Sequence, residues 1–466
     1  MEEERFDNEA RMELVATFET MLSNEQTFFF DVSEIETIAG YYFEVEEPRK
    51  ALSIIEIGEQ QHPTSENIIL YKGEALIQLG RKIEAVEVLE YALDLNPLNG
   101  NAIRILATIY AELLEHEKAI AYFEKAITFE LDFKEELFLD LAYQYQALGK
   151  FKKALFFLKE ALELNRENET ALFEVGLCYN ELDLDNEAVQ YFEAFLEQQP
   201  YSYIGWFNLG NSFYRIEEYE DALFAFDYSI LTNDSFAAAY YGKANAYIQL
   251  DEYKKAIEIL NLTFGLEQPH AFVYCHIGEC YEKLGEYNKA ITFYEKSLEL
   301  DNDQTDAWLG IGVVKDLNKQ PEEAVKFVKK ALEKDPENVE YLYVYAEILG
   351  KLGETEKSKK IFRRVVDLDP DNIDAWLDYS NILFEKSSPK DAAKLLKDAI
   401  ALNGDQEELQ YRLVAYQISV GDSENAKINL RKALSTNYKG HEKLFEFYPQ
   451  AKDITEIVDI IADYKK

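Results

Sequence analysis

The chain has 466 residues, and its 89 Asp and Glu against 48 Lys and Arg give a formal net charge of −41. So acidic a surface argues against nucleic-acid binding by the whole molecule, because phosphate contacts require clustered lysine and arginine. A hydrophobic fraction of 47% is too high for a disordered chain, and 20 Gly and 10 Pro leave little material for β-turns or flexible linkers. Two interpretations of the charge stay open, namely solvation of a large surface and attraction of basic partners.

The termini and cysteines bear on the compartment. The chain begins Met-Glu-Glu-Glu-Arg, whereas a signal peptide begins basic and then turns apolar. No apolar run approaches the roughly 20 residues that span a bilayer. Cys178, Cys275 and Cys280 form no C-x-x-C pair, which favours reduced, partly buried thiols. We therefore expect a cytoplasmic protein without membrane insertion.

The first predicted element is an amphipathic helix over residues 7–22 that caps whatever follows it. Its apolar residues at helical spacing are Leu14, Val15, Phe18, Met21 and Leu22. Three phenylalanines at 28–30 are either a docking motif or, as we prefer, a segment packed under the next element. Asp31 and Glu34 then have the spacing of a capping box, which predicts that a helix begins there.

From that point one small residue recurs every 34 residues, with a single step of 35. The series is Ala51, Ala85, Ala119, Ala154, Ala188, Ala222, Ala256, Ala290, Ala324, Ser358, Ala392 and Ala426. A large apolar residue usually follows four positions later and a small one seven positions later, so the three positions share one face of a helix. Proline twelve positions after the anchor is expected to end that helix at Pro63, Pro97, Pro200, Pro336 and Pro370.

A second helix is predicted before each anchor. It has a small residue in its middle and large apolar residues around it, as in Trp206-x-x-Leu209-Gly210-x-x-Phe213 and Tyr274-x-x-Ile277-Gly278-x-x-Tyr281. The small residue lets the two helices approach closely. Leu-Gly pairs are expected to end several of these helices with a glycine C-cap, at Leu79-Gly80, Leu148-Gly149, Leu284-Gly285 and Leu352-Gly353.

This arrangement resembles the tetratricopeptide repeat (TPR) family, whose signature is W-x2-L-G-x2-Y…A-x3-F…P over about 34 residues. The unit from Trp206 to Ala222 matches nearly position for position, and it is one of about a dozen units that share the same phase along the chain. The resemblance implies an all-α fold, an α-solenoid in which helix-turn-helix hairpins form a right-handed superhelix. The second unit, with Lys72 and Leu76, and the twelfth, with Gln410 and Gln417, depart from the pattern.

The predicted organisation has three parts and no linker. Residues 1–31 form an N-terminal capping helix and lead-in, 32–440 about twelve repeats, and 441–466 C-terminal capping helices. The repeats start near residues 32, 66, 100, 135, 169, 203, 237, 271, 305, 339, 373 and 407. The final cap is expected to use the stripe Ile454, Ile457, Val458 and Ile461. The segment from Thr27 to Tyr42 is also loosely similar to cytoplasmic TPR proteins of the Bacteroidota.

Catalytic motifs are absent from the sequence: it has no G-x-x-x-x-G-K-[ST], H-E-x-x-H or G-x-S-x-G. Cys275, His276 and Cys280, with His270 nearby, form the one cluster of metal-ligand types. Cys275 and Cys280 are five positions apart on one helix, which directs them about 140° apart and makes a shared ion awkward. We expect a non-enzyme with no catalytic residue, metal or cofactor.

The resemblance implies that the first helix of each hairpin lines a concave groove through its second, fifth, ninth and twelfth residues. Those positions carry the acids Glu36, Glu74, Glu136, Glu279, Glu282, Asp306, Asp316, Glu340, Glu347, Asp374 and Glu408. Arg104 is the one base among them. We therefore expect a protein or peptide partner with Lys- or Arg-containing segments and a salt-sensitive association rate.

The middle of the predicted groove is aromatic and rich in asparagine. Rings supply contact area and asparagine can bind a peptide backbone, although both residue types are also simply common at these positions. The candidate partner-binding residues are Glu136, Tyr143, Phe173, Asn180, Phe207, Asn208, Asn211, Tyr214, Tyr241, Asn245, Glu279 and Glu282. Asn208 and Asn211 lack the Lys and Arg neighbours of a chaperone-type carboxylate clamp, which argues against that ligand.

The C-terminal third differs in charge, because residues 305–466 carry a net of only −5. Its bases cluster on the second helices, at Lys326, Lys329, Lys330, Lys359, Lys360, Arg363, Arg364, Lys394, Lys397, Arg431 and Lys432. They form either a solvated helix face or an anion- or RNA-facing stripe. The leading hypothesis is a protein-binding scaffold or adaptor. The alternatives are a structural subunit of a larger assembly and an RNA- or ribosome-associated factor that uses this stripe, with direct nucleic-acid binding less favoured.

Overall fold

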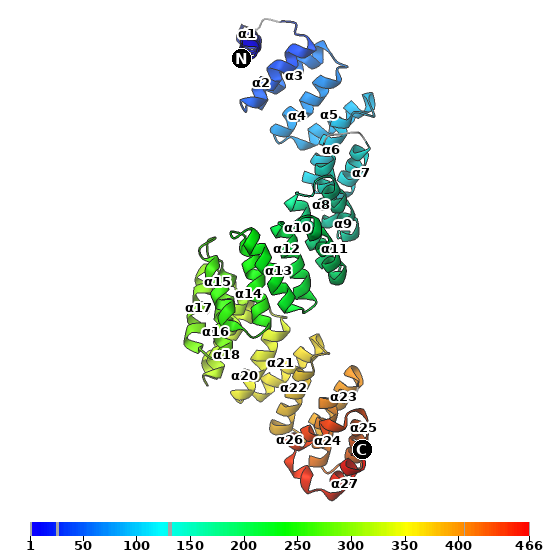
Figure 1. Cartoon of the computed structure of the whole chain (residues 1–466), viewed down its shortest axis with the longest axis vertical. Helices are drawn as coiled ribbons and strands as arrows, with labels where there is room; N and C mark the ends of the chain where they lie inside the picture. Colours follow the sequence, from blue (N-terminus) through cyan, green and yellow to red (C-terminus); the bar gives the residue numbers. More distant parts are fainter. Residues whose placement is uncertain (1, 25–27, 129–132, 405, 466) are drawn as a thin grey trace. The chain divides into compact units, whose positions relative to one another are not determined.

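The computed structural model describes residues 2–24, 28–128, 133–404 and 406–465. In these ranges the chain consists of α-helices, two short 3-10 helices and connecting turns, with no β-strand (Figure 1). The predicted all-α solenoid of helical hairpins is therefore confirmed. The chain divides into two compact units, Met1–Asp234 and Ser235–Lys466.

The first unit contains a leading helix followed by six hairpins, each made of two helices that are consecutive in the chain. Its helices are α1 (Glu2–Asn24), α2 (Val32–Glu44), α3 (Pro48–Gln61), α4 (Glu66–Gln78), α5 (Lys82–Leu95), α6 (Gly100–Glu112), α7 (His116–Ile127), α8 (Lys134–Ala147), α9 (Phe151–Leu164), α10 (Glu169–Glu181), α11 (Asp185–Gln198), α12 (Tyr203–Arg215) and α13 (Tyr219–Thr232).

The second unit continues the same pattern with six hairpins and ends in short helices. They are α14 (Ala237–Gln249), α15 (Tyr253–Thr263), α16 (Ala271–Lys283), α17 (Tyr287–Leu300), α18 (Thr305–Leu317), α19 (Pro321–Lys334), α20 (Val339–Lys351), α21 (Thr355–Leu368), α22 (Ile373–Lys386), α23 (Pro389–Asn403), α24 (Glu407–Ser419), α25 (Ser423–Thr436), η1 (Tyr438–Gly440), α26 (His441–Phe447), η2 (Pro449–Asp453) and α27 (Thr455–Asp463). The atypical second and twelfth repeats also form hairpins, α4/α5 and α24/α25.

The turns and helix ends follow the sequence pattern. The predicted C-cap glycines have left-handed backbone, with φ of 74° at Gly80 and 72° at Gly285. Other repeats place a non-glycine residue in the same conformation, as at Leu114, where φ is 59°. Each predicted helix-ending proline lies two residues beyond the helix, for example Pro63 after α3.

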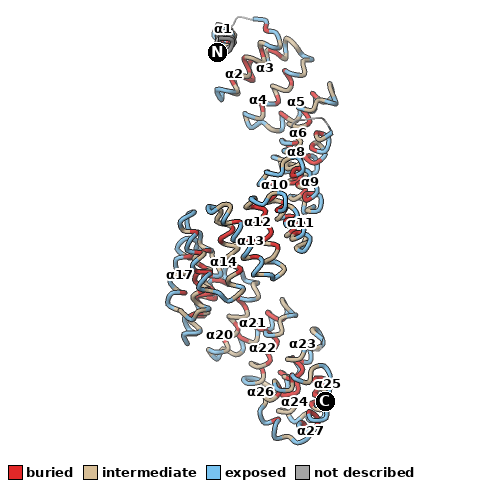
Figure 2. Tube along the Cα trace, in the orientation of Figure 1, coloured by how far each residue is buried: buried red, intermediate tan, exposed pale blue. Residues whose placement is uncertain are grey.

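Each hairpin buries the stripe of small and large residues between its two helices (Figure 2). The anchors from Ala51 to Ala426 are buried, and so are the large residues four positions after them, among them Phe123, Phe226 and Phe362. A small residue on one helix leaves room for the large one on its neighbour, and this complementarity brings the helices together. The periodic stripe is thus the core of both units.

The N-terminal predictions are confirmed in part. Asp31 caps α2 and forms the expected capping box with Glu34. The Glu34 N–H donates a 2.9 Å hydrogen bond to the Asp31 carboxylate, and the Asp31 N–H donates one of 2.8 Å to the Glu34 carboxylate. Of the three phenylalanines, Phe30 is buried, while Phe28 and Phe29 are exposed. Gln61 of α3 bonds the backbone of this segment, so packing on the first hairpin holds for Phe30. Thr27, where the Bacteroidota-like segment begins, lies outside the described residues.

At the C-terminus, α27 buries Ile457, Ile460 and Ile461 against α25 and its neighbours. Val458 is exposed, so the predicted stripe is corrected by one position, because Ile460 and not Val458 shares the face of Ile457 and Ile461. Across the described part of the chain, no helix has the combination of length and apolar composition that a membrane crossing needs.

Candidate functional site

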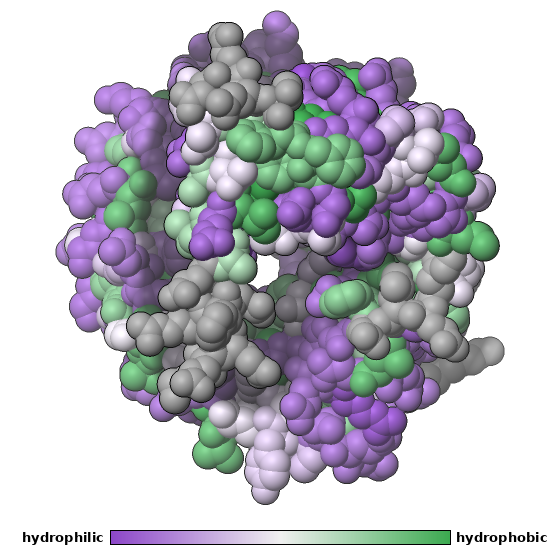
Figure 3. Space-filling view, turned by 90° about the horizontal axis from the view of Figure 1, so that it is seen from above, coloured by the Kyte–Doolittle hydropathy of each residue, from purple (hydrophilic) through white to green (hydrophobic). Residues whose placement is uncertain are grey.

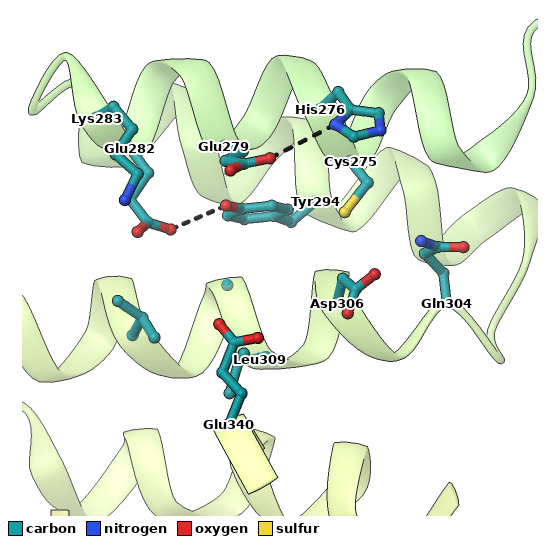
Figure 4. A pocket seen from close by; sticks show the side chains of 12 residues that line it. Cys275, His276, Glu279, Glu282, Lys283, Tyr294, Gln304, Asp306, Leu309 and Glu340 are labelled. Carbon is teal, nitrogen blue, oxygen red and sulfur yellow. Dashed lines mark hydrogen bonds and ion pairs between the residues drawn. The ribbon is translucent and has the colours of Figure 1, made fainter. Parts of the chain in front are cut away.

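The first helices of three consecutive repeats in the second unit line a pocket of about 320 Å³ (Figure 4). Four carboxylates border it: Glu279 and Glu282 on α16, Asp306 on α18 and Glu340 on α20. All four occupy positions that the repeat pattern assigned to the groove. The 34-residue period therefore brings acids that are far apart in the chain to one place.

Tyr294 of α17 forms the floor of this pocket, and two glycines make room for its ring. A Cβ at Gly278 would lie 2.7 Å from the ring, and one at Gly310 would overlap it. The side chain is buried, and its hydroxyl donates a 2.8 Å hydrogen bond to Glu282 (Figure 4). Tyr341 likewise donates a 2.6 Å bond to Asp306. Buried phenols thus hold two of the four carboxylates in place, and sequence reasoning assigned neither tyrosine to the site.

Burial and neighbouring charge set the electrostatics of the pocket. Burial raises the pKa of Glu282; the hydrogen bond from Tyr294 and the charge of Lys283 offset part of this rise, and the nearby Glu279 and Glu340 add to it. The pKa of Glu279 is lowered, mainly by a hydrogen bond from His276, whose Nδ1 lies 3.5 Å from the carboxylate. Glu282 is therefore a carboxylate whose ionised form lacks sufficient compensation, and an added positive charge would stabilise it.

Cys275 also lines the pocket, but its thiol is weakly reactive. Burial, together with Asp306 and Glu279, raises the pKa of its thiol to about 12, so the reactive thiolate is scarce at neutral pH. Within the described residues, no group of three His, Cys, Asp or Glu side chains is arranged to hold a metal ion. His276 and Lys283 are the basic residues among those that line the pocket.

Elsewhere in the second unit, lysines that the position rule did not assign to the groove neutralise some predicted groove acids. Lys351 forms a 2.5 Å ion pair with Asp316, and Lys443 forms one of 2.5 Å with Glu408. A further groove pocket of about 360 Å³ combines Glu347 and Asp378 with Lys351. Asp316 and Glu408 are therefore already paired with lysines, whereas no ion pair involves Glu282 or Glu340 in the part of the chain that the structure describes.

In the first unit, the structure corrects the assignment of Asn208. Its side chain is only 4% exposed and donates a 2.8 Å hydrogen bond to the carbonyl of Leu172. A side chain at Gly176 would overlap it, so the glycine admits this amide between the helices. Asn208 therefore joins two repeats internally and does not present its amide to a ligand.

The other candidates of the first unit lie on its first helices with part of their surface accessible. Phe173 and Phe207 stack with ring centroids 6.2 Å apart. Glu136 is exposed, while the remaining four are half-buried: Tyr143, Asn180, Asn211 and Tyr214. Half-burial with ring stacking fits both a contact surface and ordinary packing.

Tyr241 and Asn245 belong to α14, in the second unit. Tyr241 meets Phe272 edge to face at 4.9 Å, and its hydroxyl donates to Glu267. The candidates of the groove middle thus divide between the two compact units, whereas Glu279 and Glu282 share one pocket.

The surface drawn in Figure 3 is largely hydrophilic, with apolar residues in small separate patches. A partner of that face would meet mostly polar and charged groups, because no broad apolar patch is visible there. Polar recognition in a groove is consistent with this surface.

Paired helices that recur with a 34-residue period define a helical-repeat solenoid. Family models described as tetratricopeptide repeat match residues 70–132, 139–203, 207–263, 271–304, 317–378 and 351–415. Together they cover more than half of the chain, which therefore belongs to the tetratricopeptide repeat family. Proteins of this family are generally scaffolds for protein interaction or subunits of assemblies, and are generally not catalysts.

No curated protein matches the sequence. Among solved structures, the chain is similar to the APC/C hetero-tetramer Cut9-Hcn1, at 13% identity and a TM-score of 0.45, over 86% of this chain and 93% of that one. It is also similar to YrrB, a TPR protein with an unusual peptide-binding site, at 22% identity and a TM-score of 0.32, over 41% of this chain and 98% of that one. A tetratricopeptide repeat protein from Parabacteroides merdae is similar at 21% identity and a TM-score of 0.40, over 53% of this chain and 98% of that one.

Proposed function

We propose that this protein is an interaction scaffold whose pocket around Glu282 binds a partner segment that carries Lys or Arg. The observation that carries the proposal is the gathering of four carboxylates from α16, α18 and α20 around one half-buried pocket. A basic side chain entering there would pair with Glu282 and Glu340 and relieve their mutual repulsion.

The pocket favours a long basic side chain over a diffuse positive surface. Two of its carboxylates, Glu282 and Asp306, accept hydrogen bonds from Tyr294 and Tyr341 and so are positioned before a ligand arrives. Preorganised acceptors lose little conformational freedom on binding, which supports affinity. Exposed acids on the second helices lie outside this pocket and would contribute mainly long-range attraction.

The test uses the full chain and a fluorescent peptide of alternating lysine and alanine. We expect Glu282→Gln combined with Glu340→Gln to weaken the peptide's affinity by about tenfold or more in fluorescence anisotropy. The matched control is Glu299→Gln with Glu333→Gln, which removes the same charge from exposed sites on α17 and α19. This control should stay within about twofold of the parent protein.

Salt and specificity provide the second readout. Affinity should fall as ionic strength rises, because the pairing is electrostatic. Equal losses in the pocket and control variants would show that only net charge matters and would overturn the proposal. Affinity purification at low salt, with and without the pocket substitutions, would then recover natural partners.

The alternative of an RNA-facing stripe receives less support from the structure. Several of its bases already have acidic or aromatic partners: Lys359 pairs with Glu356, Arg363 with Asp367 and Arg364 with Glu337, and Lys330 lies 3.8 Å from the Trp308 ring centroid. Such pairing lowers the positive potential that phosphate contacts require. Nothing in the geometry favours an assembly subunit over a scaffold.

A further inference from the structure

In two repeats of this protein, two rings of the first helix enclose one ring of the second. In the eighth repeat, Tyr274 and Tyr281 of α16 lie 6.2 and 5.4 Å from Phe293 of α17. The fourth repeat has the same arrangement of Phe138, Tyr145 and Phe157. These rings fill the outer side of the hairpin.

The twelfth repeat has amides at the three equivalent positions, 136 residues further along than in the eighth. They are Gln410 and Gln417 on α24 and Asn429 on α25. Gln410 is 4% exposed and Gln417 is 1% exposed. Asn429 donates a 2.9 Å hydrogen bond to the Gln417 side-chain oxygen. An apolar cluster has thus become a buried polar one.

This amide cluster is incompletely satisfied. Both side-chain polar atoms of Gln410 and the nitrogen of Gln417 are buried without a hydrogen-bond partner. Burying an amide without a partner is unfavourable, and such groups in native proteins usually meet water or a ligand. Their orientation therefore points to a molecule that supplies both donors and acceptors.

Gln410 and Gln417, which carry the unpartnered amide atoms, line two cavities that lysines also line. Gln410 lines a pocket of about 270 Å³ together with Asn429, Lys397 and Lys432. Gln417 lines a neighbouring pocket with Lys390, Lys394 and the shared Lys397. The two pockets run along α24 between α23 and α25, and Asp422 is the one acid that lines either of them in the described residues.

We propose that this amide pocket, formed by Gln410, Gln417, Asn429 and Lys397, binds an extended peptide segment that carries carboxylates. A glutamine with a free donor and a free acceptor matches a peptide group, which offers the complementary pair. The lysines match acidic side chains of the same segment. Gln410 and Gln417 are seven residues apart, or about 10 Å along a helix, which corresponds to about three residues of extended chain.

This site has the opposite charge preference from the Glu282 pocket. It lies on the outer side of the twelfth repeat, whereas the Glu282 pocket is formed by first helices of repeats eight to ten. The two sites can therefore be tested separately, with an acidic and a basic peptide.

The test measures binding of a blocked, fluorescent peptide of alternating glutamate and alanine to the full chain. One variant combines Gln410→Trp, Gln417→Tyr and Asn429→Phe, which restores rings of the kind found in other repeats. It should fold with an unchanged or higher melting temperature and bind the peptide at least about tenfold more weakly. Peptide binding that survives the rings would overturn the proposal.

The second variant is Lys397→Glu, which should also weaken the acidic peptide by about tenfold. Its control is Lys329→Glu on α19, an exposed lysine at the same position of repeat nine, with an expected change within about twofold. Equal losses in both variants would overturn the site and indicate general charge attraction.

Two further outcomes would also overturn the proposal. If the acidic peptide does not bind the parent protein, water satisfies the amides. If inorganic phosphate binds in a Lys397-dependent manner and the peptide does not, the pocket is a phosphate site. Neither result affects the Glu282 pocket, because the lysine peptide and its variants report on that pocket alone.

Discussion

The eighth and twelfth repeats build the same hairpin from different chemistry. In the eighth, Gly278 leaves space for the buried Tyr294; in the twelfth, the equivalent pair is Val414 and Leu430, both fully buried. A small residue with a large one has been exchanged for two residues of intermediate size, a kind of change that cores tolerate when total volume is roughly kept. The twelfth repeat therefore has no counterpart of the Tyr294 phenol, which in the eighth repeat donates a hydrogen bond to Glu282. Amides also replace the outer rings. Repeats with one backbone can thus present an acidic inner pocket and a cationic outer one.

The largest expected effect comes from removing the Tyr294 ring from the core of the eighth repeat. Tyr294→Ala should lower the free energy of unfolding by about 4 kcal/mol, because it opens a cavity between α16 and α18. It also removes the hydrogen bond to Glu282. Leu430→Ala in the twelfth repeat should cost about 3 kcal/mol. Urea unfolding combined with hydrogen exchange of each repeat measures both, since a repeat array need not unfold in one step.

Tyr294→Phe is the control, because it keeps the ring and loses only the hydroxyl. It should cost about 1 kcal/mol. If Tyr294→Ala cost no more than Tyr294→Phe, the ring would contribute nothing to packing and the comparison of the two repeats would fail.

Exchanging the outer residues should have the next largest effect. Phe293→Asn gives the eighth repeat an amide among the rings of Tyr274 and Tyr281 and should destabilise it by about 2 to 3 kcal/mol. Gln410→Trp with Gln417→Tyr and Asn429→Phe should stabilise the twelfth repeat by about 1 to 2 kcal/mol, since unpartnered amides are replaced. Thermal unfolding of both proteins would reveal opposite signs. Effects of the same sign would mean that the amides are already well satisfied.

The hairpin turns should respond equally in the two repeats. Gly285 and Gly421 have φ of 72° and 79°, a left-handed conformation that a Cβ disfavours. Gly285→Ala and Gly421→Ala should therefore each cost about 1 kcal/mol, measured by urea unfolding. A clear difference between them would show that the repeats differ in backbone as well as in side chains.

The smallest expected effect is the contribution of Glu282, in the eighth repeat, to the pH dependence of stability. Because burial raises the pKa of Glu282 in the folded state, the native protein takes up this proton before the unfolded chain as pH falls. Stability should then rise as pH drops through the range just above the ordinary glutamate value. Binding of the lysine peptide should weaken over the same range, because the carboxylate loses its charge.

Glu282→Gln should abolish this contribution in unfolding and binding measured across pH. Glu279, whose pKa is lowered, would contribute in the opposite direction at more acidic pH, so the difference between parent and variant is the quantity to compare. An unchanged pH profile in the variant would show that Glu282 is not the titrating group.

The sequence by itself determined the repeat architecture. The anchor spacing predicted the helices, the Leu-Gly pairs predicted turns such as that at Gly285, and Asp31 with Glu34 predicted the start of α2. These features depend on contacts within one hairpin, so a local pattern is enough to specify them. The period also places equivalent acids on one face of the first helices, and their role in a binding groove stays a prediction.

Tertiary structure alone decided how those side chains are used. Lys351 pairs with Asp316 of the preceding repeat, Asn208 turns inward to Leu172, and Glu340, two repeats away, raises the pKa of Glu282. Each of these contacts depends on how neighbouring hairpins stack and on which rotamers that stacking allows. A motif fixes the position of a residue in its repeat. The residues that bury it or pair with its charge are about 35 to 60 positions away, and the local pattern does not specify them.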